Sequence, residues 1–214
     1  MKLDLKSIRQ EYKKGELTGG SIPKNPFILF NQWLEEAIRK GLVEPTAMLV
    51  STVSAEGAPS SRTVLLKGIK ENKLLFYTSY DSRKGRQLKD NPKIALTFVW
   101  PEFERQVHFE GVAHKLSTEE SDAYFATRPH KSQIGARVSH QSLPIENRLE
   151  LMQAFIKESA RWIDKEVERP TNWGGYAVSP QRIEFWQGRP NRLHDRFLYK
   201  LTETGDWSIE RLSP

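Results

Sequence analysis

Hydrophobic residues in the first part of the chain recur at the spacing of helices. A short helical pattern near residues 4–14 is followed by IPKNPF, whose two prolines interrupt a regular element. A second helix is predicted over about 27–40, because the apolar residues from Phe27 to Ile38 form one stripe and Gly41 follows. The chain is therefore expected to begin with helices.

The pattern then changes to that of strands. The predicted strands cover residues 46–54, 61–69, 73–80, 93–100 and 105–116. Turn-like segments such as AEGAPS and KENK separate them, and such short spacing favours an antiparallel barrel or sandwich. Apolar residues occupy both parities of these strands, so both faces of the sheet are expected to be covered.

Helical patterns return in the second half. Ser117 and Glu120 have the spacing of a capping box, which predicts a helix start. Residues 145–167 form an amphipathic pattern, which we interpret as a helix that packs on the barrel or on a partner. The segments WGGYAVSPQRIEFWQG, HDRFLYKL and WSIERL predict closing strands. The expected fold is α+β, a single domain over 1–214 whose β core is split by helical insertions.

Composition limits the function classes. The chain has 214 residues, no cysteine and a formal net charge of +6, so disulfides, thiolate nucleophiles and cysteine-based metal sites are excluded. The charged N-terminus does not resemble a signal peptide, and no apolar run reaches the ~18 residues of a membrane helix. We expect a cytoplasmic protein without membrane contact. The modest positive charge suits an anionic partner.

One cationic cluster lies in DSRKGRQLKDNP, where Asp81 or Ser82 can cap a helix. Arg83 and Lys84 would then occupy its first turn, although cations are disfavoured at the positive end of a helix dipole. A bound anion would relieve this conflict, because helix N-termini bind phosphates. A solvated basic turn is the alternative interpretation.

Two further segments contain cationic residues that could bind an anion. Arg62 and Lys67 lie on an apolar strand at opposite parity, so on a regular strand they point to opposite faces. Tyr124 and Arg128 share a helix face, Pro129 ends that helix, and Ser132 is expected to cap the next segment. Each could also be an ordinary surface feature.

Other chemistry is weakly represented. The five histidines lack the spacing of a zinc site, so no metal is predicted, and His108 is interpreted as a solvent or edge residue. The discrete cationic clusters indicate anionic small molecules, with more than one phosphate. A nucleic-acid-binding barrel is the alternative from a different class, but it would interleave aromatic and basic residues on one sheet face. We expect no nucleic-acid partner.

A longer segment is far more specific. The sequence IEFWQGRPNRLHDR at 183–196 resembles the C-terminal signature of the pyridoxine/pyridoxamine 5'-phosphate oxidase family. The same resemblance covers RTVLLK, YTSYDSRKGRQ, ERQV, YFATRPHKSQIGA, SHQS and WGG in family order, and so spans nearly the whole chain.

The resemblance implies an antiparallel, Greek-key-like split β-barrel with surrounding helices that binds FMN and forms a homodimer. The active sites would lie at the subunit interface, with residues 1–25 as an N-terminal lid segment and 170–214 as a dimerisation and active-site segment. The implied FMN contacts, some from the other subunit, are Arg62, Thr63, Val64, Leu65, Leu66, Lys67, Tyr77, Thr78, Arg83, Lys84, Gln106, Gln141, Ser142, Trp186 and Arg196.

The resemblance also implies the substrate contacts. The substrate phosphate would be held by Lys67, Tyr124, Arg128 and Ser132, and Arg192 and His194 would be the catalytic pair over the substrate ring, with Leu193 between them. Arg9 and Tyr12 resemble a lid, and Phe197 and Tyr199 would return to the barrel core.

The implied reaction is the FMN-dependent oxidation of pyridoxine 5'-phosphate and pyridoxamine 5'-phosphate to pyridoxal 5'-phosphate, with O2 as acceptor. Another split-barrel FMN oxidase, such as a phenazine-pathway oxidase or a flavin reductase-like protein, is the alternative within the fold.

Overall fold

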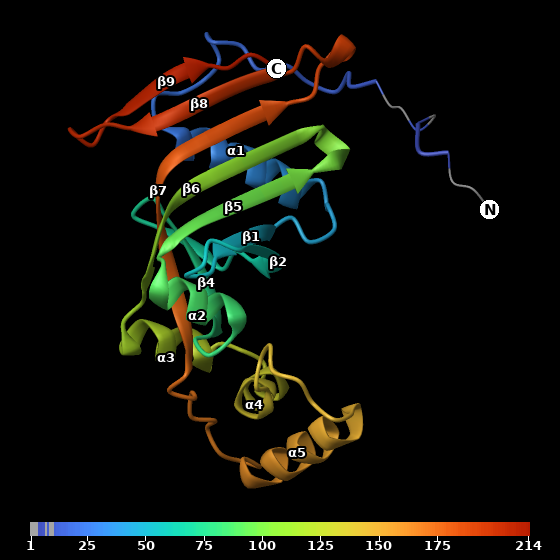
Figure 1. Cartoon of the computed structure of the whole chain (residues 1–214), viewed down its shortest axis with the longest axis vertical. Coiled ribbons are helices and arrows are strands. Elements are labelled where there is room, and N and C mark those ends of the chain that lie inside the picture. The colour runs from blue at the N-terminus through green and yellow to red at the C-terminus, as the bar shows by residue number, and fades with distance from the viewer. Residues whose placement is uncertain (1–3, 7, 9–10) are drawn as a thin grey trace. The chain divides into compact units, whose positions relative to one another are not determined.

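The computed structural model describes residues 4–6, 8 and 11–214 (Figure 1). The helices are α1 Pro26–Arg39, α2 Arg83–Asp90, α3 Thr118–Ala126, α4 His130–Val138 and α5 Arg148–Arg161, with short 3-10 helices η1 Pro101–Phe103 and η2 Pro190–Arg192. The strands are β1 Ala47–Val53, β2 Pro59–Leu65, β3 Gly68–Lys70, β4 Lys73–Ser79, β5 Lys93–Trp100, β6 Arg105–Lys115, β7 Trp173–Gln187, β8 Asp195–Leu201 and β9 Trp207–Arg211.

Among the described residues, the strands form one sheet in the order β2-β1-β5-β6-β7-β4-β3, and β8 pairs with both β7 and β9. The pairs β3–β4, β4–β7, β7–β8 and β8–β9 are antiparallel. The α+β content and the antiparallel sheet agree with the prediction from the sequence.

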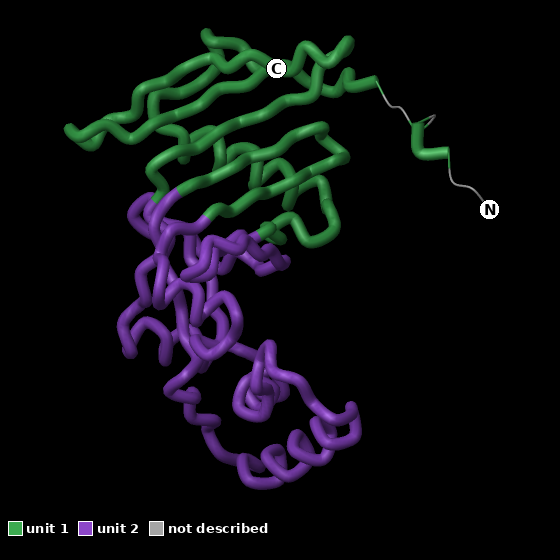
Figure 2. The backbone as a smooth tube through the Cα atoms, in the orientation of Figure 1, with its two compact units in different colours: residues 1–49, 95–110, 180–214 green, residues 50–94, 111–179 purple. Residues whose placement is uncertain are grey.

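The chain divides into two compact units that alternate along the sequence (Figure 2). Unit 1 comprises residues 1–49, 95–110 and 180–214, and unit 2 comprises 50–94 and 111–179. Strands β1, β5, β6 and β7 each contribute residues to both units.

Unit 1 is organised around an aromatic core. The ring of Phe30 on α1 packs 5.0 Å from Phe98 and 4.9 Å from Phe109, centroid to centroid. Helix α1 begins where predicted, because Asn25 caps it and Pro26 occupies its first turn, where the missing N–H costs nothing. Phe197 and Tyr199 on β8 are buried, as expected.

Unit 2 has its own core beneath α3, α4 and α5. It consists of Phe125, Ile134, Trp162, Val167 and Trp173. Both halves of the predicted capping box at Ser117 and Glu120 are present at the start of α3. Within the described part of the chain, no helix combines the length and apolar character needed to cross a membrane.

Several sequence-based expectations about single elements are wrong. The described residues between 4 and 14 form no helix, and Leu5 and Ile8 are exposed. The strand predicted over 61–69 is interrupted after Leu65 and resumes as β3. The helix predicted over 145–167 is limited to α5.

Two apolar surfaces remain exposed. Helix α5 buries none of its residues fully, and Leu149, Met152 and Ile156 are at least half exposed. On the unit 1 sheet, Leu49 is 44% and Val99 is 54% exposed. The expectation that both faces of the sheet are covered is therefore wrong for a single chain.

Candidate functional site

Unit 2 contains a cavity of about 810 Å³. Its lining comes from β2, β4, the start of α2, the α3–α4 junction, the segment 141–142 and the start of β7: Ser60, Ser61, Arg62, Thr63, Val64, Leu65, Lys67, Tyr77, Thr78, Arg83, Lys84, Tyr124, Arg128, Pro129, Ser132, Gln141, Ser142 and Trp173. Five of these lining residues are cationic and none is acidic. An uncompensated cluster of this kind fits anionic ligands.

The start of α2 places Lys84 in the cavity wall. Ser82 caps the helix and accepts a hydrogen bond from the Gly85 N–H. Of the two predicted caps, Asp81 and Ser82, the structure therefore has Ser82. The Lys84 side chain is 5% exposed, and its Nζ donates to Thr78 Oγ1 at 2.9 Å and to Gln141 Oε1 at 3.2 Å. Burial, with a smaller effect of the Arg62 charge, lowers the pKa of Lys84 to about 8.

Arg62 is held on β2 by neutral acceptors. Its Nη1 donates to Thr52 Oγ1 at 2.6 Å, and its Nη2 donates to Ser60 Oγ at 2.6 Å. Both hydroxyls in turn donate to Gln87 Oε1, so the guanidinium is fixed without a carboxylate partner in these contacts. Burial and then the charge of Arg83 lower the pKa of Arg62. The Arg62 guanidinium therefore has hydrogen-bond acceptors, but none of these acceptors carries a negative charge to balance its own.

An aromatic stack forms another part of the wall. The rings of Tyr77 and Tyr124 are 3.6 Å apart and nearly parallel, and Trp173 stacks 5.7 Å from Tyr77. The Arg128 guanidinium lies 4.6 Å from the Trp173 ring. Its Nη1 is buried and has no hydrogen-bond partner among the described residues. A buried N–H without a partner is costly, so this group fits a ligand oxygen.

The interruption of the strand overturns one argument about parity. Arg62 and Lys67 both line this cavity, because β2 ends at Leu65 and the chain no longer alternates regularly up to Lys67. The expectation of opposite faces was made for a regular strand, and Lys67 lies outside β2, so it does not apply here. Leu66 is buried but is not among the lining residues.

The junction between α3 and α4 also differs from the prediction. Ser132 lies inside α4 and does not cap it, because Pro129 occupies the N-cap position. Ser132 nevertheless lines the cavity together with Tyr124 and Arg128. Gln141 and Ser142 line it too, so these two predicted cofactor contacts share a cavity with Lys84 of the same chain.

Unit 1 holds the other predicted site residues. A second cavity of about 760 Å³ is lined by Ile8, Glu11, Tyr12, Trp186, Arg189, Asn191, Arg192 and His194. The ring of His194 lies 4.7 Å from Trp186 and 5.6 Å from Tyr12. Asn191 and Arg192 are both left-handed, with φ of 55° and 61°, a conformation that side chains disfavour. The loop that presents Arg192 is therefore strained.

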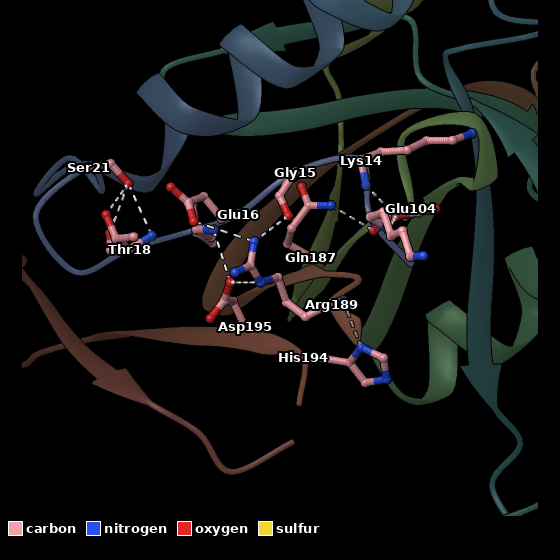
Figure 3. A network of polar contacts seen from close by, with 12 residues as sticks. Lys14, Gly15, Glu16, Thr18, Ser21, Glu104, Gln187, Arg189, His194 and Asp195 are labelled. Atoms are coloured by element: carbon pink, nitrogen blue, oxygen red, sulfur yellow. Dashed lines mark hydrogen bonds and ion pairs between the residues drawn. The ribbon is translucent and has the colours of Figure 1, made fainter. Parts of the chain in front are cut away.

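The protonation state of His194 follows from its contacts. Its Nδ1 accepts a hydrogen bond from the Arg189 backbone N–H at 3.1 Å (Figure 3). Burial, with a smaller effect of Arg192, lowers the pKa of His194. The neutral ring with its proton on Nε2 is therefore favoured near pH 7, and that nitrogen can donate a hydrogen bond.

The remaining predicted residues lie as follows. Arg196 is paired with Glu184 through its Nε at 2.7 Å and Nη2 at 3.1 Å. Gln106 lines a smaller unit 1 cavity together with Tyr12 and Trp186. Leu193 is 67% exposed. Arg9 lies outside the described residues.

Sequence reasoning missed one residue that lines the unit 2 cavity and two buried carboxylates of unit 1. Trp173 stacks in the unit 2 cavity, and its only local signal is an aromatic residue before two glycines. A Cβ on Gly174 would lie 2.1 Å from the Tyr80 hydroxyl, so close packing requires that glycine. Glu104 and Asp195 in unit 1 are buried carboxylates that bind backbone N–H groups, and their spacing in the sequence gave no indication of this.

Two family models together match most of the chain. One, described as pyridoxamine 5'-phosphate oxidase, matches residues 34–172. The other, described as pyridoxine 5'-phosphate oxidase C-terminal dimerisation region, matches residues 173–214.

Curated relatives match over the full length. A pyridoxine/pyridoxamine 5'-phosphate oxidase from Bacteroides thetaiotaomicron is 63% identical over 211 residues, which cover 99% of either chain. A protein of the same name from Porphyromonas gingivalis is 51% identical and covers 100% of both chains.

Solved structures share the fold. PhzG from Burkholderia lata, in complex with tetrahydrophenazine-1-carboxylic acid, has a TM-score of 0.86 and 29% identity, covering 91% of this chain and 95% of that chain. An FMN-binding protein from Nostoc punctiforme, related to pyridoxamine 5'-phosphate oxidase, has a TM-score of 0.73 at 19% identity and covers 90% of this chain and 100% of its own. The expected α+β split β-barrel is confirmed.

Proposed function

Because the chain belongs to the pyridoxamine 5'-phosphate oxidase family, we propose that it oxidises pyridoxine 5'-phosphate and pyridoxamine 5'-phosphate to pyridoxal 5'-phosphate. FMN is the proposed cofactor and O2 the proposed electron acceptor. The absence of cysteine suits the reducing cytoplasm, which we propose as the location.

The unit 2 cavity is the observation that carries this proposal. It combines five cationic side chains, no acidic one and a stack of aromatic rings, which suits phosphorylated aromatic molecules. Arg62, Arg83 and Lys84 would hold the FMN phosphate. Lys67, Tyr124, Arg128 and Ser132 would hold the substrate phosphate, to which the free Nη1 of Arg128 can donate.

When bound, FMN supplies the acceptor for the hydride that leaves the substrate's 4' carbon. The chain itself binds and orients. Arg192 would lie over the substrate ring and favour negative charge on the 4' oxygen. His194 would donate a hydrogen bond from Nε2, because its Nδ1 already accepts the Arg189 N–H. An orienting role therefore fits His194 better than that of a base.

The electron balance is simple. The alcohol loses a hydride and a proton and becomes the aldehyde. The amine becomes an imine, which water hydrolyses to the same aldehyde and ammonia. In either case two electrons and two protons finally reach O2 and give hydrogen peroxide.

We also propose that the protein is a homodimer with active sites at the subunit interface. A matched region described as a dimerisation region supports this, as do the exposed apolar residues on the unit 1 sheet and α5. Light scattering on the active protein should give twice the monomer mass of 24.8 kDa. A stable monomer with full activity would contradict the dimer.

The activity is tested on purified protein with each phosphorylated substrate. We expect a yellow protein that releases FMN on denaturation and forms pyridoxal 5'-phosphate and peroxide in equal amounts. PhzG, with its phenazine ligand, defines the second candidate, because its fold is so similar. Turnover of a reduced phenazine carboxylate, with none of either B6 phosphate, would replace our proposal with that function.

A further inference from the structure

The N-terminal segment 12–17 is held in place by a buried carboxylate. Glu104 is 8% exposed, and its Oε2 accepts hydrogen bonds from the backbone N–H groups of Lys13 at 2.8 Å and Lys14 at 2.9 Å (Figure 3). Charged acceptors form the stronger hydrogen bonds to backbone N–H groups. These two contacts join residues that are about ninety positions apart in the sequence.

The backbone conformation of Glu104 is unfavourable for a residue with a side chain. Glu104 follows the 3-10 helix η1 with a left-handed φ of 55°, where glycine is the residue with the least strain. A glutamate at this position has a conformational cost, and the two hydrogen bonds from the N-terminal segment offset it. Its carbonyl also accepts the Gly188 N–H at 2.7 Å, which ties it to the end of β7.

Two further side chains bind the same segment. Arg189 Nη1 donates to the Gly15 carbonyl at 2.9 Å, and Asp195 Oδ2 accepts the Leu17 N–H at 3.1 Å (Figure 3). Arg189 thereby links the N-terminal segment to His194, because its own backbone N–H donates to His194 Nδ1.

Tyr12 directly precedes the residues that make these contacts. Its ring packs edge-on against Trp186 at 5.6 Å and against His194 at the same distance. A Cβ on Gly188 would lie 2.8 Å from the Tyr12 ring and 2.9 Å from Glu104 Cβ, so these groups are closely packed. Tyr12 completes the wall of the unit 1 cavity that also contains Arg192.

We propose that Glu104 is a positioning residue for the oxidation, which acts by holding Tyr12 against His194 at the substrate site. This inference rests on the proposed function. Glu104 itself lines no part of the cavity that contains Arg192, so its effect would pass through the backbone of Lys13 and Lys14.

Two substitutions separate this role from general stability. E104G removes the carboxylate but suits the left-handed backbone, so the fold should tolerate it. E104Q retains an oxygen acceptor of the same reach without the charge. The control is E102Q, which neutralises an exposed glutamate two residues away in η1.

The first measurement is hydrogen–deuterium exchange of the holoprotein. We expect the Lys13 and Lys14 amides to be protected in the wild type and in E102Q, exposed in E104G, and intermediate in E104Q. This readout does not depend on turnover, so it remains informative if the proposed function fails.

The second measurement is steady-state kinetics, with flavin content and unfolding temperature as checks. E104G should raise KM for pyridoxine 5'-phosphate by about tenfold while kcat changes by less than about twofold, because the segment supplies uniform binding. E104Q should recover part of the loss. Unprotected amides in the wild type, or lost protection in E104G with unchanged KM, would overturn the proposal. So would a rise in KM in E104G without loss of amide protection.

Discussion

Lys84 shares the unit 2 cavity with Arg62 and Arg83, and its pKa of about 8 lies well below the ordinary value for lysine. A bound phosphate beside the ammonium favours the charged form and would raise this pKa again. At about pH 8, FMN binding to the apoprotein should therefore take up about half a proton per site. At about pH 6.5 Lys84 is already protonated, and the uptake from this group should vanish.

Calorimetric titration of the apoprotein in buffers with different ionisation enthalpies measures this uptake. The matched variant is Lys84→Arg, because a guanidinium stays charged at both pH values and retains a phosphate donor. Equal proton uptake at pH 8 in Lys84→Arg and the wild type would show that another group titrates.

Arg128 gives the second prediction at this scale. Its buried Nη1 lacks a partner, so Arg128→Ala should raise KM for pyridoxine 5'-phosphate by on the order of 10²-fold, the equivalent of about 2–3 kcal/mol. Flavin content should remain unchanged, and kcat should change less than KM. The control is Arg86→Ala, which removes an exposed arginine of α2 that does not line the cavity.

Steady-state peroxide formation with pyridoxine and with its phosphate completes that test. Wild-type protein should strongly prefer the phosphate, and Arg128→Ala should lose much of this preference. If the wild type has equal kcat/KM for the two compounds, these residues do not form a phosphate site.

At the scale of elements, two helical glycines allow a direct comparison. A Cβ on Gly85 in α2 would lie 2.1 Å from the Tyr80 carbonyl oxygen, which is backbone and cannot move away easily. Gly85→Ala should therefore lower the free energy of unfolding by about 3 kcal/mol and displace the neighbouring Lys84. Gly135 in α4 has open space, so Gly135→Ala should stabilise the protein by about 0.5–1 kcal/mol.

Chemical denaturation of both variants measures these changes. A Gly85→Ala protein as stable as the wild type would mean that the tight turn at Tyr80 adapts, and that α2 is not fixed by this contact.

The elements that the sequence predicted well carry local signals. Helix α1 has a single apolar stripe with a cap before it, and α3 has both residues of its capping box. The helix expected over 4–14 had only a short stripe, and the structure gives Leu5 and Ile8 no burial that would stabilise it. The strand ends after Leu65, but the sequence has no proline or glycine there before Gly68, so no local pattern predicted the interruption.

The candidate site was predictable in a different sense. The resemblance supplied residues such as Gln141 and Lys84, but only the fold brings them within 3.2 Å of each other. Glu104 shows the limit more clearly. Its importance depends on two backbone N–H groups from a distant segment, and no periodicity or motif encodes such a contact.

At the scale of the whole molecule, the site residues are divided between two units. Lys84 and Arg128 belong to unit 2, whereas Arg192 and His194 belong to unit 1. If each active site combines residues of two subunits, as we propose, a heterodimer of Lys84→Ala and Arg192→Ala chains would contain one doubly substituted site and one intact site. Such a dimer should have about half of the wild-type activity.

Two different affinity tags on the co-expressed chains allow this heterodimer to be isolated. Each variant homodimer serves as its own control and should be nearly inactive. Failure of the heterodimer to exceed the homodimers would mean that Lys84 and Arg192 serve the same site from one chain.

If FMN is the cofactor, as we propose, the five cations of the unit 2 cavity would also link the amount of this protein to the nutritional state of its cell. Their mutual repulsion is relieved when anions bind, and a ligand that binds only the folded chain increases the folded fraction by mass action. Each tenfold rise in free ligand above its dissociation constant adds about 1.4 kcal/mol. Chains made during a shortage of riboflavin would unfold and meet proteases more often. The amount of this protein in the cell would thus follow the vitamin supply without any change in the synthesis of the chain.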